Sequence, residues 1–221
     1  MEKLSETLLS LECLGLEIPT DCRPTKDFGV TIGHLPCLNA FTLLYRYIFT
    51  NPVDVEEMII GLTSTCGPQL KKLNLGAYKF PGKALFEILP NCPNLERLTF
   101  ALIDRDILLY SRVVGECSFR GELSFTHATS LFNELGRYMW EYPDGFYKIF
   151  VNIEKVNIYT DSLEEGELRR AEGIAQVIVK DRAEFRGRVD ENFNINVFRL
   201  SDYMLVEKSL NEIHSERYGN S

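Results

Sequence analysis

The sequence predicts an α/β fold in which short strands and helices alternate along one chain of 221 residues. Three observations lead to this prediction. An apolar spacing of i, i+3 and i+5 recurs, amphipathic helix patterns fall between the copies, and a cysteine-led phrase occurs twice, as "CGPQLKKLNL" (66–75) and "CPNLERLTF" (92–100). Units of this kind bury their apolar faces by stacking on their neighbours. We therefore expect a short solenoid with a curved parallel sheet and with helices on its convex side.

The apolar spacing is clearest between residues 8 and 103. Its copies are "LECLGL", "LNAFTL", "LKKLNL" and "LERLTF", which begin at Leu11, Leu38, Leu70 and Leu95. Side chains alternate between the two faces of a strand, so the second and third apolar residues of each copy share one face. Each copy therefore predicts a strand that turns two apolar side chains into a core.

The same spacing is weaker between residues 151 and 201. There "IEKVNI", "IAQVIV" and "INVFRL" begin at Ile153, Ile174 and Ile195 and predict three further strands. We expect an irregular insertion near 104–150, in which "GELSF", with Leu123 and Phe125, reads as a degraded copy. The prediction is thus a single domain over 1–221, which ends in a helix at 202–215.

Helix patterns separate the predicted strands. Apolar residues recur at helical spacing over 51–66, 82–92 and 130–140. An acidic stretch at 161–173 predicts an exposed helix, because Glu165 and Arg169 stand four residues apart and can pair on one helix face. Strands and helices therefore alternate with a period of 25 to 32 residues in the first half of the chain, which is typical of leucine-rich repeats.

The cysteine-led phrase resembles the repeats of F-box-associated leucine-rich-repeat proteins, whose helices end in C-P-x-L-x-x-L-x-L. "CPNLERLTF" is similar to it throughout, "CGPQLKKLNL" carries one inserted residue, and "LPCLNAFTL" has Cys37 displaced. The resemblance implies a non-catalytic protein–protein interaction module, and by family analogy one that recognises substrates for a ubiquitin ligase. No F-box is visible in the chain, so the ligase role is an analogy alone.

Composition narrows the function classes further. A net charge of −8 argues against general binding to nucleic acid or to anionic membranes, and no apolar run approaches the roughly 18 residues that a membrane helix needs. The six cysteines are expected to be buried free thiols, because no secretion signal or C-x2-C pair accompanies them. These features predict a cytoplasmic or nuclear protein without cofactor or metal.

Enzymatic motifs are sparse. His34, His127 and His214 are scattered, and "GAYKFPGKA" (76–84) resembles a phosphate-binding loop but has alanine where the hydroxyl residue should stand. We therefore predict that the chain is not an enzyme. Two alternatives remain open: an enzyme with its site in 104–221, and a scaffold without a ligand.

The residues that alternate with the buried pairs are expected to line the concave face of the sheet. Several of them are basic although the chain is acidic, which favours a protein partner with an acidic or phosphorylated segment. An ordinary solvated sheet face fits the same pattern, and the aromatic turn at 140–150 is a second candidate surface. The predicted contact residues are Lys72, Asn74, Arg97, Thr99, Lys155, Asn157, Tyr159, Lys180 and Arg199.

Overall fold

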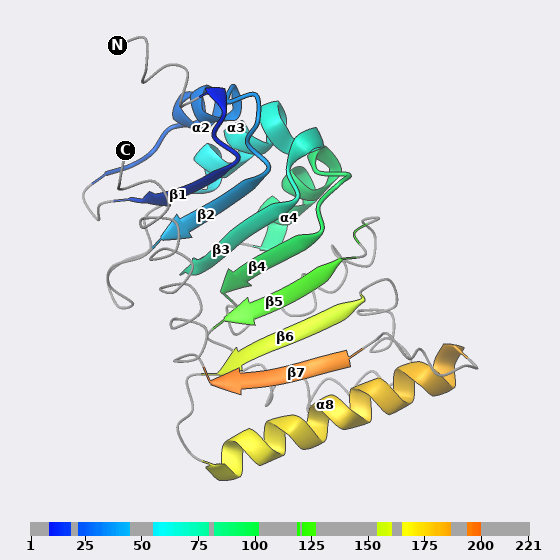
Figure 1. Cartoon of the computed structure of the whole chain (residues 1–221). Helices are drawn as coiled ribbons and strands as arrows, with labels where there is room; N and C mark the ends of the chain where they lie inside the picture. Colours follow the sequence, from blue (N-terminus) through cyan, green and yellow to red (C-terminus); the bar gives the residue numbers. More distant parts are fainter. Residues whose placement is uncertain are drawn as a thin grey trace.

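The protein forms one parallel β-sheet with helices, which confirms the α/β class. The structure, a computed structural model, describes residues 9–18, 22–44, 55–79, 82–101, 119, 121–126, 154–160, 165–186 and 194–199. The strands are β1 (Cys13–Glu17), β2 (Ala40–Leu44), β3 (Lys72–Lys79), β4 (Arg97–Ala101), β5 (Glu122–Thr126), β6 (Lys155–Thr160) and β7 (Asn194–Arg199). They lie side by side in the order of the sequence, and every neighbouring pair is parallel (Figure 1).

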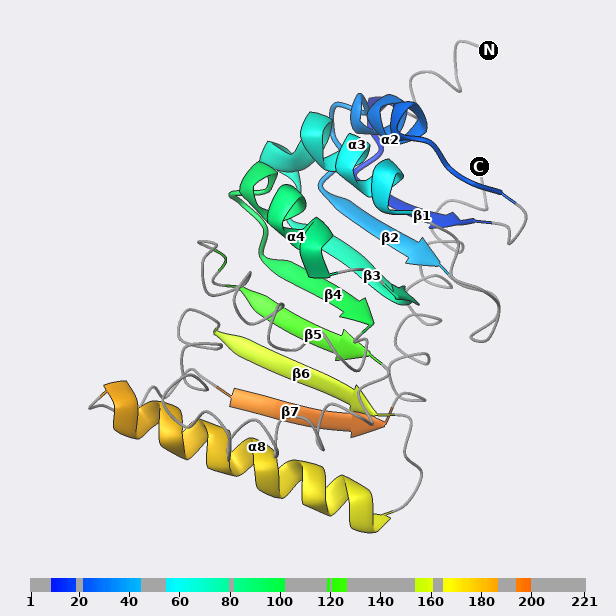
Figure 2. The ribbon, with the colours of Figure 1, turned by 180° about the vertical axis from the view of Figure 1, so that it is seen from behind.

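Three helices cover one face of the sheet at its β1–β4 end (Figure 2). They are α2 (Lys26–Gly33), α3 (Glu56–Cys66) and α4 (Gly82–Ile88), and the 3-10 turns η1 (Gly67–Gln69) and η2 (Leu89–Asn91) follow the last two. Helices α2 and α3 touch so closely that a Cβ atom on Gly29 would lie 1.9 Å from the Met58 carbonyl oxygen. Glycine is thus required where these two helices meet.

Helix α2 is absent from the sequence prediction, although its start carries a recognisable signal. Thr25 caps the helix by accepting a hydrogen bond from the Phe28 N–H at 3.3 Å, and Asp27 stands in the first turn. The first copy of the repeat therefore has a helix like those that follow.

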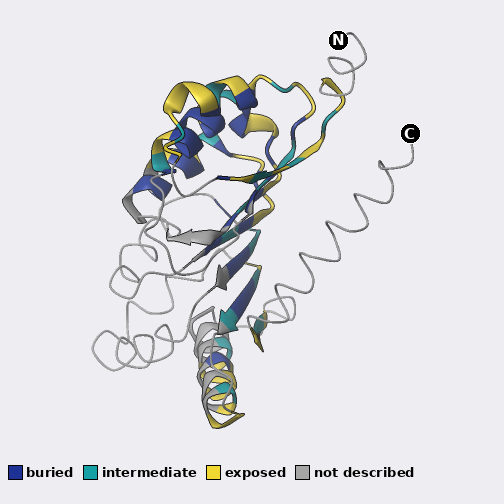
Figure 3. Ribbon diagram, turned by 90° about the vertical axis from the view of Figure 1, so that its left-hand side faces the viewer, coloured by how far each residue is buried: buried dark blue, intermediate teal, exposed yellow. Residues whose placement is uncertain are grey.

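The core lies between the sheet and the helices (Figure 3). Phe41, Leu73, Leu98, Leu123 and Val156 align across β2–β6 and are at most 1% exposed. Two residues further along, Leu43, Leu75, Phe100 and Ile158 are equally buried. The predicted apolar pairs therefore form two continuous buried rows.

The same pattern of backbone hydrogen bonds recurs at the start of successive strands. Ala40 N–H donates to the Glu12 carbonyl, Lys72 N–H to Asn39, and Arg97 N–H to Lys71, at 3.0 to 3.1 Å. The turns before β3 and β4 are also alike, since Leu70 N–H donates to the Gly67 carbonyl and Leu95 N–H to the Cys92 carbonyl, three residues back in each case. Leu70 N–H also reaches the Cys66 carbonyl. Both cysteines are buried, as the repeated phrase predicts.

One predicted strand is wrong. Residues 174–179 belong to helix α8 (Glu165–Arg186), which contacts β7. The predicted helix at 161–173 is confirmed in kind, and Arg169 pairs with Glu165, but the helix continues for a further three turns or so. Gly173 stands between the two halves of this stretch, but one glycine costs a helix only about 1 kcal/mol, so the helix runs on through the apolar residues that follow.

The predicted insertion contains a strand of the sheet. Strand β5 lies within 104–150, and its Leu123 stands opposite Leu98 of β4 and Val156 of β6. The degraded copy at "GELSF" is therefore confirmed. The rest of that segment, with the predicted helix at 130–140 and the aromatic turn at 140–150, lies outside the described residues, as does the predicted helix at 202–215.

Strand β7 differs from its predicted register by one residue. Ile195 stands opposite Val156 and Val197 opposite Ile158, so these two share the face of the buried rows. Phe198, expected to point inward, lies on the other face. A shift of one residue exchanges the two faces of a strand, because side chains alternate with a period of two.

Candidate functional site

The face of the sheet opposite α2–α4, called here the open face, carries two aligned rows of side chains. The first row consists of Cys13, Ala40, Lys72, Arg97, Glu122, Lys155 and Asn194. The second row, two residues further along each strand, consists of Gly15, Thr42, Asn74, Thr99, Ser124, Asn157 and Asn196. Parallel strands in register bring these residues, scattered over more than 180 positions, to a spacing of about 4.8 Å.

The first row is charged in its middle. Arg97 Nε lies 3.5 Å from Glu122 Oε2, and Lys155 Nζ lies 3.4 Å from Glu122 Oε1. Glu122 thus stands between two cations and orients both. The basic residues predicted on this face do not form an uninterrupted row, since the acidic side chain of Glu122 stands between Arg97 and Lys155.

The second row forms a ladder of side-chain hydrogen bonds. Asn157 donates from Nδ2 to Ser124 Oγ at 3.2 Å and to Glu122 Oε1 at 2.5 Å, and it accepts a bond from Asn196 Nδ2 at 3.1 Å. Asn157 is 2% exposed and Ser124 7% exposed. Buried polar groups need such partners. Asn157 was predicted to contact the partner, and its burial makes it instead a residue that positions Glu122.

An aromatic pair lies beyond this ladder, at the carboxyl ends of β6 and β7. The rings of Tyr159 and Phe198 stack with their centroids 5.2 Å apart and their planes 23° from parallel. Phe198 is 37% exposed, so the open face carries apolar surface at this corner.

A groove of about 590 Å³ lies at the amino ends of β4, β5 and β6. Its lining includes the buried apolar residues Leu89, Leu95 and Phe119. It also includes Arg97, Glu122 and Lys155 of the first row. Gly121 also lines the groove, and a Cβ atom there would approach the Glu96 carbonyl oxygen to 2.0 Å. The groove therefore combines apolar and charged walls next to the first row.

Of the nine predicted contact residues, the open face brings together seven. They are Lys72, Asn74, Arg97, Thr99, Lys155, Asn157 and Tyr159. Lys180 lies on α8, outside the sheet, and Arg199 shares the face of Ile195 and Val197. The first misplacement follows from the wrong strand at 174–179, and the second follows from the one-residue register shift of β7.

Sequence reasoning missed five residues of this face: Glu122, Ser124, Asn194, Asn196 and Phe198. The first two were available in "GELSF", had that copy been treated as a strand. The others were available in "NINVF", where polar and apolar residues alternate.

The thiols fall into two classes. Burial raises the pKa of Cys66 to about 11, and burial together with the neighbouring Cys66 thiolate raises that of Cys92 to about 12, so both are poor nucleophiles. Cys13, Cys22 and Cys37 are exposed, which corrects the expectation of buried thiols, and Cys117 lies outside the described residues. No group of three or more His, Cys, Asp or Glu side chains that could hold a metal occurs in the described part of the chain.

Among the described residues, no helix combines the length and apolar character needed to cross a membrane. Comparisons of the chain with protein-family models, with curated proteins and with solved structures find no match.

Proposed function

We propose that the protein is a non-catalytic interaction module of the leucine-rich-repeat type, and that its open face binds an extended acidic or phosphorylated segment of a partner protein. The observation that carries this proposal is the register of the first row, which lines up Lys72, Arg97, Glu122 and Lys155 on consecutive strands. Support for the repeat type comes from the two buried rows and from the strand-entry hydrogen bonds that recur from unit to unit.

The charges of the row suit an anionic segment. Three cations and one carboxylate leave the row with a net positive charge, although the whole chain carries −8. Lys72 and Arg97 lie on neighbouring strands, which are about 4.8 Å apart, so one phosphate or carboxylate can contact both. The guanidinium group of Arg97 can bind such a group through two N–H groups. Glu122 holds Arg97 and Lys155 in place, which lowers the entropy lost on binding.

The groove adds a means of selecting the segment. Leu89, Leu95 and Phe119 provide apolar walls beside Arg97 and Lys155. An apolar side chain next to the acidic residue of the partner can enter there, and such apolar anchors supply much of the affinity of protein interfaces. The preferred ligand is thus an acidic or phosphorylated residue with an apolar neighbour.

By the resemblance stated above, this partner would be a substrate presented to a ubiquitin ligase in the cytoplasm or nucleus. This part of the proposal depends on the resemblance alone. The binding of an acidic segment depends on the described side chains and can be tested without it.

The test compares two charge reversals that alter net charge equally. Lys72→Glu with Arg97→Glu changes the first row, whereas Arg23→Glu with Lys26→Glu changes exposed residues at the start of α2. Both proteins and the unaltered chain are applied to arrays of acidic and phosphorylated peptides with and without an apolar neighbour, at low and high salt. We expect the first pair to lose binding and salt dependence and the second to retain both, because screened attraction acts at the contact surface.

Equal peptide binding by the two reversal variants would place the binding surface elsewhere. Absence of binding by the unaltered chain to every acidic and phosphorylated peptide would reject the partner chemistry. Urea unfolding of both variants serves as the folding control, since exposed substitutions usually change stability by no more than about 0.5 kcal/mol.

A further inference from the structure

The groove at the amino ends of β4, β5 and β6 is lined by more carboxylates than cations. The cations are Arg97 and Lys155, and the carboxylates are Glu96, Glu122 and Glu154. The first row as a whole has a net positive charge, but two cations and three carboxylates leave the groove itself with a net negative charge. A purely acidic partner segment would therefore meet repulsion inside the groove.

Two of these carboxylates stand in one line across the starts of the strands. The strand register places Glu96, Gly121 and Glu154 next to one another, one position before the first row. The Glu154 N–H donates to the Gly121 carbonyl at 3.3 Å, which continues the pairing into this line. Glu96 and Glu154 are two strands apart, or roughly 9–10 Å. Gly121 puts no side chain between them.

Both carboxylates are available to a cation of a partner. Glu96 Oε1 lies 3.4 Å from Lys71 Nζ, but the two side chains are 60% and 56% exposed, and such exposed pairs are weak. Glu154 is exposed, and its side chain makes no salt bridge or hydrogen bond within the described part of the chain. Glu122 differs from both, because two cations of the first row already hold it.

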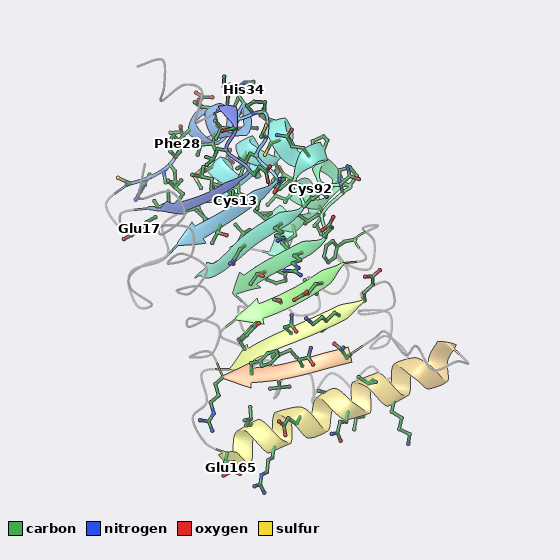
Figure 4. The ribbon with its side chains drawn as sticks, in the orientation of Figure 1. Cys13, Glu17, Phe28, His34, Cys92 and Glu165 are labelled. Carbon is green, nitrogen blue, oxygen red and sulfur yellow. The ribbon has the colours of Figure 1, made fainter. Side chains whose placement is uncertain are left out.

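The lining also has an apolar part, which includes Leu89, Pro93, Leu95 and Phe119. Figure 4 shows Cys92, another residue of the lining, at the turn before β4. The volume of about 590 Å³ lies within the usual range of ligand pockets. The groove can therefore hold an apolar side chain together with the charged groups next to it.

We propose that the groove binds a partner segment in which an apolar residue stands between an acidic or phosphorylated residue and a basic one. This inference rests on the proposed function and defines its partner more closely. The anionic residue contacts the cations of the first row, the apolar side chain enters the groove, and the lysine or arginine lies between Glu96 and Glu154. A second acidic residue at that place is repelled, so the groove rejects other acidic segments.

The test uses peptides with an acidic or phosphorylated residue, an apolar residue and a third residue that is lysine, glutamine or glutamate. Each set is made in both chain directions, and binding to the full chain is measured by fluorescence anisotropy at low and high salt. At low salt the lysine peptide should bind about three- to tenfold more tightly than the glutamate peptide, because each exposed charge contact contributes modestly. High salt should reduce this preference.

Three altered chains assign the preference to the two carboxylates. Glu96→Gln with Glu154→Gln should remove it, and Glu96→Lys with Glu154→Lys should reverse it. The matched control is Glu12→Lys with Glu172→Lys, which changes the net charge equally at exposed residues before β1 and on α8. The control should keep the preference of the unaltered chain. Urea unfolding shows whether each altered chain is folded.

The outcomes separate this inference from the proposed function. Equal binding of the three peptides, or tighter binding of the glutamate peptide, would overturn the inference and leave the proposed function standing. A preference for lysine that survives both changes at Glu96 and Glu154 would also overturn it, because the lysine would then contact another surface. Absence of binding by every peptide would reject both. A second copy of the chain in the groove would make the measured mass rise with concentration and fall on addition of peptide, and this result would also overturn the inference.

Discussion

The two halves of the sheet bury their inner faces alike and their outer faces differently. On the inner face, Leu73 and Leu98 of β3 and β4 are as buried as Leu123 and Val156 of β5 and β6. On the open face, Lys72 and Arg97 in the first row of β3 and β4 are exposed. Ser124 and Asn157 in the second row of β5 and β6 are buried and hydrogen-bonded.

The difference shows two ways of holding parallel strands together. The β1–β4 half has three helices packed on it, and its stability comes from apolar contact, which is non-directional. The β5–β7 half adds a directional network, in which Glu122, Ser124, Asn157 and Asn196 must all be present to satisfy one another. The first kind of packing accepts similar apolar residues, and the second accepts few substitutions.

The largest expected effect is on the apolar rows. Leu98→Ala should lower the free energy of unfolding by about 2–5 kcal/mol, because it leaves a cavity among side chains that are fixed by the sheet and the helices. Urea unfolding measures the change. Leu73→Ala, in the adjacent strand, should behave alike.

The matched control is Ile195→Ala on β7, where the side chain is only partly buried and the loss should be smaller. A loss for Leu98→Ala below about 0.5 kcal/mol, which is typical of surface sites, would show that the buried rows do not carry the stability of this half.

The second prediction concerns the polar network. Asn157→Ala removes the amide that bonds Glu122 and Ser124 and accepts from Asn196, and it leaves those groups short of partners. We expect a loss of about 1–3 kcal/mol in urea unfolding. Asn194→Ala, at an exposed position of the same face, removes only one exposed acceptor of the Asn196 amide, so it is the control and should cost less. Equal effects would mean that the network adds nothing to the β5–β7 half.

The third prediction concerns the cysteines of the helix-covered half and is tested by chemical labelling, without a mutation. At pH 8 a maleimide should label the exposed Cys13, Cys22 and Cys37 quickly and the buried Cys66 and Cys92 slowly, because their raised pKa values leave little thiolate. Peptide mapping by mass spectrometry measures each site. Labelling of all five at one rate would contradict the burial of this layer.

The same shifts fix the sign of a pH effect. Above the ordinary thiol value of 9.0, and below about 11 to 12, the unfolded chain has lost these protons while the folded protein retains them. The free energy of unfolding should therefore fall as the pH rises above 9. Cys66→Ala with Cys92→Ala should reduce this slope.

Several parts of the fold could be predicted from local patterns. The strands at 13–17, 40–44, 72–79 and 97–101 follow from apolar spacing and turn residues, and so does the burial of Cys66 and Cys92. The strand at 122–126 was visible in only two apolar residues. Seven of the nine predicted contact residues lie on one face because their strands were assigned in the right register.

By itself, the sequence determined which segments alternate and which side of each well-marked strand is apolar. It also showed that a cation directly precedes several of the apolar pairs. These are properties of neighbouring residues, since side-chain direction repeats every two positions in a strand. Tertiary structure alone decided that 174–179 is helical, that β7 turns Phe198 outward, and that Glu122 stands between Arg97 and Lys155. Such outcomes depend on which strand lies beside which. A short apolar run fits a helix and a strand equally well until its neighbours are in place.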